Sequence, residues 1–276
     1  MQPVDATVIP AGLQSTIVGL PNGMDLHVVE RPGSGVPVLC LHGIWDWWRY
    51  WVPLLPEGAG SFGSRPLHMV DLRGHGASGK PETGYRLRDY AADIVALIEA
   101  QGWEQVTLVG HSLGAAVSLL VVAQLPSRVD ALVLEDPPVP LQAGPSEMFR
   151  GVYEMRAQRF EQVVDDFQVW RPWLTLEQAR EVATCLTQTA DGVFQASFSG
   201  LSDGTVVPVP GVALPQPTLV LQAGNVEQRA LRAGGIELLE AALPNLTLVT
   251  IGETSHTVLR DDPAAWRAAV AAAGMG

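Results

Sequence analysis

Short, nearly continuous apolar runs recur along the chain, and stretches with helical spacing of apolar residues lie between them. Apolar runs without polar alternation indicate strands that are buried on both faces of a sheet. Strands that alternate with helices predict parallel crossover connections, so the expected fold class is α/β with a mostly parallel, doubly wound sheet. The expected strands are 36–41, 67–70, 106–109, 131–134, 218–221 and 246–251, and the expected helices are 87–100, 113–124, 228–242 and 263–273.

Two departures from this alternation are visible. Near the N-terminus, the extended runs 16–20 and 24–30 flank Pro-Asn-Gly at 21–23, which predicts an antiparallel hairpin that leads into the sheet. Between Pro137 and Pro217 the alternation lapses, and 148–166 and 176–187 have helical spacing. We therefore expect a helical cap at 138–214 inserted between two parts of one core, 1–137 and 215–276. The aromatic residues of this insertion are Trp170, Trp173, Phe194 and Phe198.

Composition narrows the function classes. The chain has 276 residues, and its 17 Lys+Arg against 29 Asp+Glu give a net charge of -12, which disfavours nucleic-acid and anionic-membrane partners. Only Cys40 and Cys185 occur, which supports neither a disulfide framework nor a cysteine metal site. The N-terminus lacks a secretion signal and no apolar run reaches about 18 residues, so a cytoplasmic location is expected.

The segment 110–114, Gly-His-Ser-Leu-Gly, matches the nucleophile-elbow pattern G-x-S-x-G. An expected strand precedes Ser112 and an expected helix follows it. A serine at a helix N-terminus lies beside unpaired backbone N–H groups, which stabilise the negative charge that develops when a carbonyl is attacked. A second match places Ser202 in a stretch without a clear strand before it and with prolines after it, so Ser202 is interpreted as a loop residue.

A serine hydroxyl needs a base to remove its proton, and the chain has six histidines. His256 follows the last expected strand directly, so it can reach the carboxyl edge of the sheet, where Ser112 is also expected. His27 and His68 lie within expected strands, and His111 lies inside the elbow with its ring directed away from the nucleophile. The sequence therefore predicts that Ser112 and His256 act together.

Four motifs in order resemble the α/β-hydrolase superfamily: Leu-His-Gly at 41–43, Asp-Leu-Arg-Gly-His-Gly-Ala-Ser at 71–78, the Ser112 elbow and the late His256. The resemblance covers nearly the whole chain outside the cap and is closest to cofactor-free esterases, carbon–carbon bond hydrolases and haloperoxidase-like perhydrolases. It implies an oxyanion hole made by the backbone amides of Ile44 and Leu113. It also implies that Asp71 and Arg73 brace loops, and that neither a metal nor an organic cofactor is needed.

The acid of the triad has two candidates. The commonest family pattern puts an aspartate three residues after a glycine that ends the seventh strand, but this chain has Glu227 at that position after Gly224. Asp136 lies at the end of the stretch 131–136, just after the expected strand 131–134, and is stiffened by the prolines at 137 and 138. A minority of superfamily branches resemble this second arrangement. Asp136 is favoured over Glu227, and Glu135 should point to the opposite face of the sheet.

The expected reaction is hydrolysis of a small-molecule ester through an acyl-enzyme on Ser112. A dense aromatic group at 45–51 follows the His-Gly motif; much of it is expected to pack against the cap, with Trp45 and His111 as candidate substrate contacts. These aromatic residues favour an apolar or aromatic substrate, and the acidic net charge mildly disfavours an anionic one. Carbon–carbon cleavage, lactone hydrolysis, peracid formation and a receptor without turnover stay open as alternatives, and the sequence leaves the oligomeric state undetermined.

Overall fold

A computed structural model describes residues 3–4, 8–55, 62–140, 147–199 and 213–276. Its centre is an eight-stranded sheet with the order β1-β2-β4-β3-β5-β6-β7-β8. β1 and β2 pair antiparallel, as do β2 and β4, and all other neighbouring strands are parallel. The expected doubly wound α/β class is confirmed, including the N-terminal hairpin. The strands are β1 (Gln14–Gly19), β2 (Asp25–Arg31), β3 (Val38–Leu41), β4 (Leu67–Val70), β5 (Val106–His111), β6 (Val129–Glu135), β7 (Thr218–Ala223) and β8 (Leu246–Ile251).

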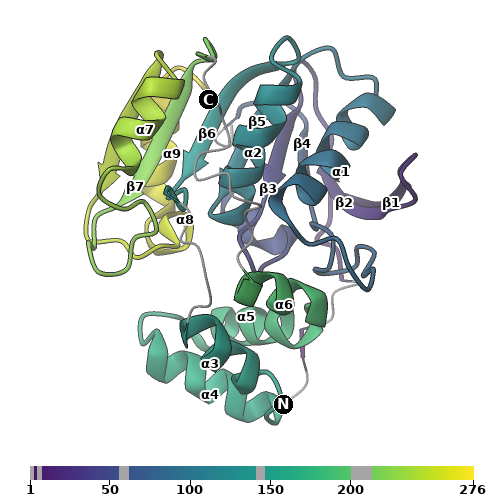
Figure 1. Cartoon of the computed structure of the whole chain (residues 1–276), viewed down its shortest axis with the longest axis vertical. Helices are drawn as coiled ribbons and strands as arrows, with labels where there is room; N and C mark the ends of the chain where they lie inside the picture. Colours follow the sequence, from purple (N-terminus) through teal and green to yellow (C-terminus); the bar gives the residue numbers. More distant parts are fainter. Residues whose placement is uncertain (1–2, 5–7, 56–61, 141–146, 200–212) are drawn as a thin grey trace.

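Helices cover both faces of the sheet (Figure 1). On one face, α1 (Leu87–Ala100), α2 (Leu113–Gln124) and α7 (Gly235–Ala242) pack on one apolar cluster. On the other face, the 3₁₀ helix η1 (Trp48–Leu54), α8 (Val258–Asp261) and α9 (Pro263–Ala272) pack on a second. The chain order reverses beside β3, which lies between β4 and β5, and such a reversal opens a crevice at the carboxyl ends of the strands.

Two helix predictions were wrong in their bounds. The expected helix 228–242 begins only at Gly235, because Gly234 adopts a left-handed conformation with φ 81° that interrupts the helix. The expected helix 148–166 is two helices. The first ends in a turn at 156–158, and the extended backbone of Arg159 separates this turn from the second helix. Apolar spacing continues on both sides of each break, so periodicity alone could not reveal it.

Four helices connect β6 to β7, and Figure 1 places them together (green) beyond one end of the sheet: α3 (Glu147–Met155), α4 (Phe160–Trp170), α5 (Leu176–Gln188) and α6 (Asp191–Ser199). They share an apolar cluster of their own, which includes Phe194 of α6 and which Trp45 of the core joins. The chain boundaries of the cap stay a prediction, since 141–146 and 200–212 lie outside the described residues. Ser202 falls in the second of these gaps.

The aromatic group at 45–51 divides between two clusters. Trp48, Tyr50 and Trp51 are fully buried against α8 and α9 rather than against the cap, so the expected packing of this group was largely wrong. Trp45 packs on the cap, edge-on to Phe149 with 5.1 Å between the ring centroids. None of the helices in the described part of the chain combines the length and the apolar character needed to cross a bilayer.

Candidate active site

Ser112 stands between β5 and α2, where the backbone turns sharply with φ 50° and ψ -112°. Few residues other than glycine adopt a positive φ, so the turn is strained. Two glycines let it pack closely: a Cβ at Gly114 would lie 1.9 Å from the Leu41 carbonyl oxygen, and one at Gly110 would lie 2.5 Å from the Ala115 nitrogen. Only glycine fits at either position. Ser112 is 7% exposed and faces a cavity.

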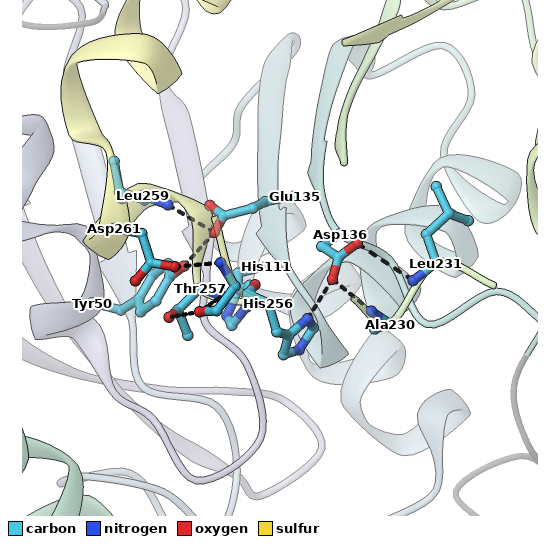
Figure 2. Close-up of polar contacts among 11 residues, drawn as sticks. Tyr50, His111, Glu135, Asp136, Ala230, Leu231, His256, Thr257, Leu259 and Asp261 are labelled. Atoms are coloured by element: carbon cyan, nitrogen blue, oxygen red, sulfur yellow. Dashed lines mark hydrogen bonds and ion pairs between the residues drawn. The ribbon is translucent and has the colours of Figure 1, made fainter. Parts of the chain in front are cut away.

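His256 lies in the loop between β8 and α8, and its Nδ1 donates a hydrogen bond to Asp136 Oδ2 at 2.6 Å (Figure 2). Asp136 follows β6 directly and is completely buried, whereas the His256 side chain is 24% exposed. Of the two candidate acids, the structure therefore brings Asp136 to the histidine. Glu227 is exposed in the loop after β7, and no contact between it and His256 is recorded.

The carboxylate of Asp136 has two further donors. The backbone N–H of Ala230 binds Oδ2 at 2.6 Å, and that of Leu231 binds Oδ1 at 3.4 Å (Figure 2). These hydrogen bonds fix the orientation of the carboxylate toward His256. Asp136 itself has a positive φ of 40°. The loop before α7, rather than a residue signal near Asp136, supplies these donors, which the sequence did not suggest.

Ser112 and His256 line the same cavity of about 510 Å³. A hydrogen bond between them is not among the contacts of the described residues, and such bonds often become short only when substrate is bound. Ile44 and Leu113 also line this cavity. Within the described parts of the chain, neither of their backbone amides donates a hydrogen bond to another backbone carbonyl of a loop or helix end. Leu113 is the first residue of α2, so its amide has no acceptor within the helix.

His42 fixes the loop that carries Ile44. Its Nδ1 donates to the Gly43 carbonyl at 2.7 Å, and its Nε2 accepts the Leu72 amide at 2.9 Å, so the ring is neutral and joins the loops after β3 and β4. Burial lowers the pKa of His42, which agrees with this state. The next loop is braced as well: Asp71 accepts from His27 at 2.7 Å and from the Trp48 amide at 2.8 Å.

Arg73 anchors the same loop to α1. Its guanidinium makes a two-pronged pair with Asp93, with distances of 2.6 and 2.5 Å, and donates to the Gly84 carbonyl at 2.6 Å. Planar pairs of this type hold geometry well. Asp71 and Arg73 thus contact loop and helix groups rather than the cavity.

His111 and Trp45, the two candidate substrate contacts, both line the cavity. The ring of His111 stacks on Tyr50, with 4.4 Å between centroids, and its Nε2 donates to the His256 carbonyl at 3.1 Å. His111 is therefore a support for the His256 loop as well as a wall residue. Burial lowers its pKa well below the usual value, and the positive charges of Arg260 and Arg171 add to that effect.

A buried carboxyl beside Asp136 was not predicted as part of the site. Glu135 points to the opposite face, as the alternation of strand side chains requires. It accepts from the hydroxyl of Tyr50, from the Leu259 amide at 3.1 Å and from Trp266 Nε1 at 2.9 Å. Burial raises its pKa to about 8. Adjacent carboxyls thus serve two networks, one through His256 and one through Tyr50 (Figure 2).

Among the residues that the structure describes, no cluster of three or more His, Cys, Asp or Glu side chains could hold a metal ion. Cys40 and Cys185 are both buried as free thiols.

Comparison with known proteins adds a family. A family model described as the alpha/beta hydrolase fold matches residues 36–263. A 2-(acetamidomethylene)succinate hydrolase of Mesorhizobium japonicum is 42% identical over 108 residues, 39% of this chain and 38% of the relative. A lipase of Mycobacterium tuberculosis is 39% identical over 123 residues, 43% of this chain and 44% of the relative. These alignments thus span well under two thirds of either relative.

One solved structure shows how far the fold is shared. An N-formylmaleamic acid deformylase of Pseudomonas putida superposes with a TM-score of 0.78 at 24% identity, covering 93% of this chain and all of that one. At this identity the likeness concerns the fold alone.

Proposed function

The chain belongs to the α/β-hydrolase family, and from this membership we propose that it cleaves carboxylic esters of small molecules through an acyl-enzyme on Ser112. The observation that carries the proposal is the 2.6 Å bond from His256 to the buried Asp136, with His256 and Ser112 on one cavity wall. This arrangement contains a nucleophile, a base and an acid that orients the base.

In the proposed reaction, His256 removes the hydroxyl proton as Ser112 Oγ attacks the ester carbonyl. Asp136 holds the imidazole through Nδ1 and stabilises its positive charge. The amides of Ile44 and Leu113 donate to the oxyanion, and His256 returns the proton to the departing alcohol. Water then attacks the acyl-enzyme by the same route in reverse, which restores the serine and releases the acid.

The cavity supports a substrate with an apolar or aromatic body. Aromatic and aliphatic side chains make up much of its wall, among them Trp45, Phe149, Phe167, Trp170, Trp173 and Val182. A space of about 510 Å³ suits a small molecule. Burial of an apolar group there would contribute roughly 25 cal/mol for each Å² removed from water.

The first test is labelling by a fluorophosphonate together with turnover of nitrophenyl esters. We expect Ser112→Ala to abolish both, and Ser202→Ala, the matched control in the other G-x-S-x-G segment, to retain both. The opposite pattern would overturn the assignment of the nucleophile.

The second test separates the reaction classes with one substrate panel. Rapid turnover of esters without cleavage of a vinylogous diketone supports the ester hydrolase. Preference for the diketone, for lactones or for peracid formation would replace it with the corresponding alternative. A single slow turnover on every compound would indicate a ligand receptor.

A further inference from the structure

Arg171 is a cation in the cavity without an acidic partner in the described parts of the chain. It follows α4 directly and lines the same cavity as Ser112 and His256. Its guanidinium carbon lies 4.8 Å from the centroid of the Trp170 ring, and no hydrogen bond or ion pair of its side chain is recorded among the described residues. Arg260, on the same cavity, is neutralised by a two-pronged pair with Asp46, each distance being 2.9 Å.

The cavity as a whole carries excess positive charge. Its wall holds four arginines, at positions 171, 229, 232 and 260, against two acidic residues, Asp46 and Glu227. The chain around it has a net charge of -12. A concentration of one charge sign inside a low-dielectric cleft attracts ligands of the other sign, whatever the charge of the distant surface.

The charged form of Arg171 is also destabilised by its surroundings. Burial lowers its pKa and nearby Arg260 lowers it further, whereas Asp46 and Asp261 raise it by smaller amounts, so the cation is partly stripped of water beside a second cation. An arginine in such surroundings is stabilised by an anion that reaches it. Because α4 ends at Trp170, the negative end of the helix dipole partly stabilises the positive charge of Arg171 in the absence of an anion.

We propose that the substrate carries a carboxylate, separate from the bond that is cleaved, and that the guanidinium of Arg171 binds it. This inference rests on the proposed ester hydrolysis and specifies its substrate class. The planar fork of an arginine matches the two oxygens of a carboxylate, and the apolar wall around it accepts the hydrocarbon body. A half-ester of a dicarboxylic acid has both parts: one carboxyl forms the ester that Ser112 attacks, and the other stays ionised.

The test uses two esters of similar length, mono-p-nitrophenyl glutarate and p-nitrophenyl pentanoate, which differ in the free carboxylate. For Arg171→Gln we expect kcat/KM on the glutarate ester to fall about 10- to 100-fold, since a hydrogen bond to a charged group is lost. On the pentanoate ester the change should stay within about twofold. Arg171→Lys keeps the charge but loses the fork, so it should lie between wild type and Arg171→Gln. Arg150→Gln is the matched control, because Arg150 is an exposed residue of α3 that does not line the cavity.

Each result bears on one proposal. Equal losses on both esters, or no loss on the glutarate ester, would overturn carboxylate binding by Arg171. Retention of activity in Ser112→Ala on both esters would overturn the acyl-enzyme on Ser112, and absence of wild-type turnover on both would overturn the ester hydrolase itself, each independently of Arg171. Competitive inhibition by free glutarate that Arg171→Gln abolishes supports a carboxylate; inhibition of the same kind by inorganic phosphate alone would assign the site to phosphate esters instead.

Discussion

Three residues other than glycine have a positive φ in the described chain: Trp45 and Ser112, which line the cavity, and Asp136, which is buried and hydrogen-bonded to His256. Each such residue costs of order 1–3 kcal/mol, which the surrounding contacts must offset. Asp136 is held by the Ala230 and Leu231 amides, and Ser112 by the close packing of two glycines. The strain therefore lies where side chains must be aimed at a reacting atom.

The acid assignment gives the first prediction. Asp136→Asn should lower kcat by about 10³- to 10⁴-fold with little change in KM, because asparagine can hold the histidine in the wrong tautomer. Glu227 lines the cavity, and Glu227→Gln should retain near-normal turnover. Steady-state kinetics on one nitrophenyl ester compares the two. If Glu227→Gln shows the large loss and Asp136→Asn does not, the roles are reversed.

Glu135 gives a prediction on stability and pH. Its folded pKa of about 8 lies above the ordinary value of 4.5, so between these values the folded protein keeps a proton that the unfolded chain has lost. The resulting stability is fully present below pH 4.5 and is lost as the pH rises through 8. Within this window the free energy of unfolding of the wild type should fall by up to about 1.4 kcal/mol per pH unit. Glu135→Gln should not show this decrease. Urea unfolding from pH 5 to 9 measures the difference, and parallel curves would contradict it.

At this scale, the sequence was sufficient to bring Ser112 and His256 to one cavity, because each follows a strand within a recognisable pattern, while their catalytic roles stay a prediction. It was insufficient for Arg171 and for the Glu135–Tyr50 network. Arg171 follows a helix in a cap that contains no recognisable sequence motif. Its proposed role rests on the absence of an acidic partner among the described residues, which the sequence does not reveal. Glu135 looks like any strand-end carboxylate until the distant Trp266 and the Leu259 amide are placed beside it.

Among the elements, those with dense apolar cores were predictable almost to the residue. Strands β4 and β8 and helices α1 and α2 have the expected bounds, because their apolar runs end at polar or turn residues. The loop at 225–234 was mistaken for the start of a helix because its spacing is helical. Tertiary contacts decide its conformation: two of its amides donate to Asp136 instead of to helical carbonyls.

The contact of α2 with β3 predicts a reversal of the usual effect of glycine in a helix. Gly114→Ala should destabilise the protein by about 3 kcal/mol or more, because the new Cβ would meet the Leu41 carbonyl oxygen at 1.9 Å. Gly151→Ala in α3, where a Cβ meets nothing within 4 Å, should instead stabilise by up to about 1 kcal/mol. Thermal and urea unfolding report both changes. Destabilisation of equal size in the two variants would contradict the close-packing argument.

At the scale of the whole molecule, the cap helices contact the core at several places, among them Trp45 and the loop after β4. Near α6, the Ala190 amide donates to the Gly74 carbonyl at 2.8 Å, and a Cβ at Gly192 would lie 2.3 Å from Tyr85 Cε2. The cap thus approaches the loop after β4 closely. The net charge of -12 describes the whole surface but not the space beneath this cap, so total acidity alone does not determine which substrate charge the cavity accepts.

This junction gives a prediction on the cap. Gly192→Ala should push α6 away from Tyr85, raise KM for nitrophenyl esters several-fold and speed proteolytic cleavage within the cap, while fluorophosphonate labelling of Ser112 persists. Gly151→Ala, on α3 of the same cap, should leave KM and the cleavage pattern unchanged. A loss of labelling in Gly192→Ala would show that the core, rather than the junction, had been disturbed.

The proposed position of the acid directly after β6 has a consequence for how substrate preference can change. Under this proposal the loop after β7 supplies no catalytic side chain, and only its main chain, through the Ala230 and Leu231 amides, holds Asp136. The neighbouring side chains of Arg229 and Arg232 line the cavity. We therefore expect that exchange of these two residues changes substrate preference without altering the proposed catalytic residues.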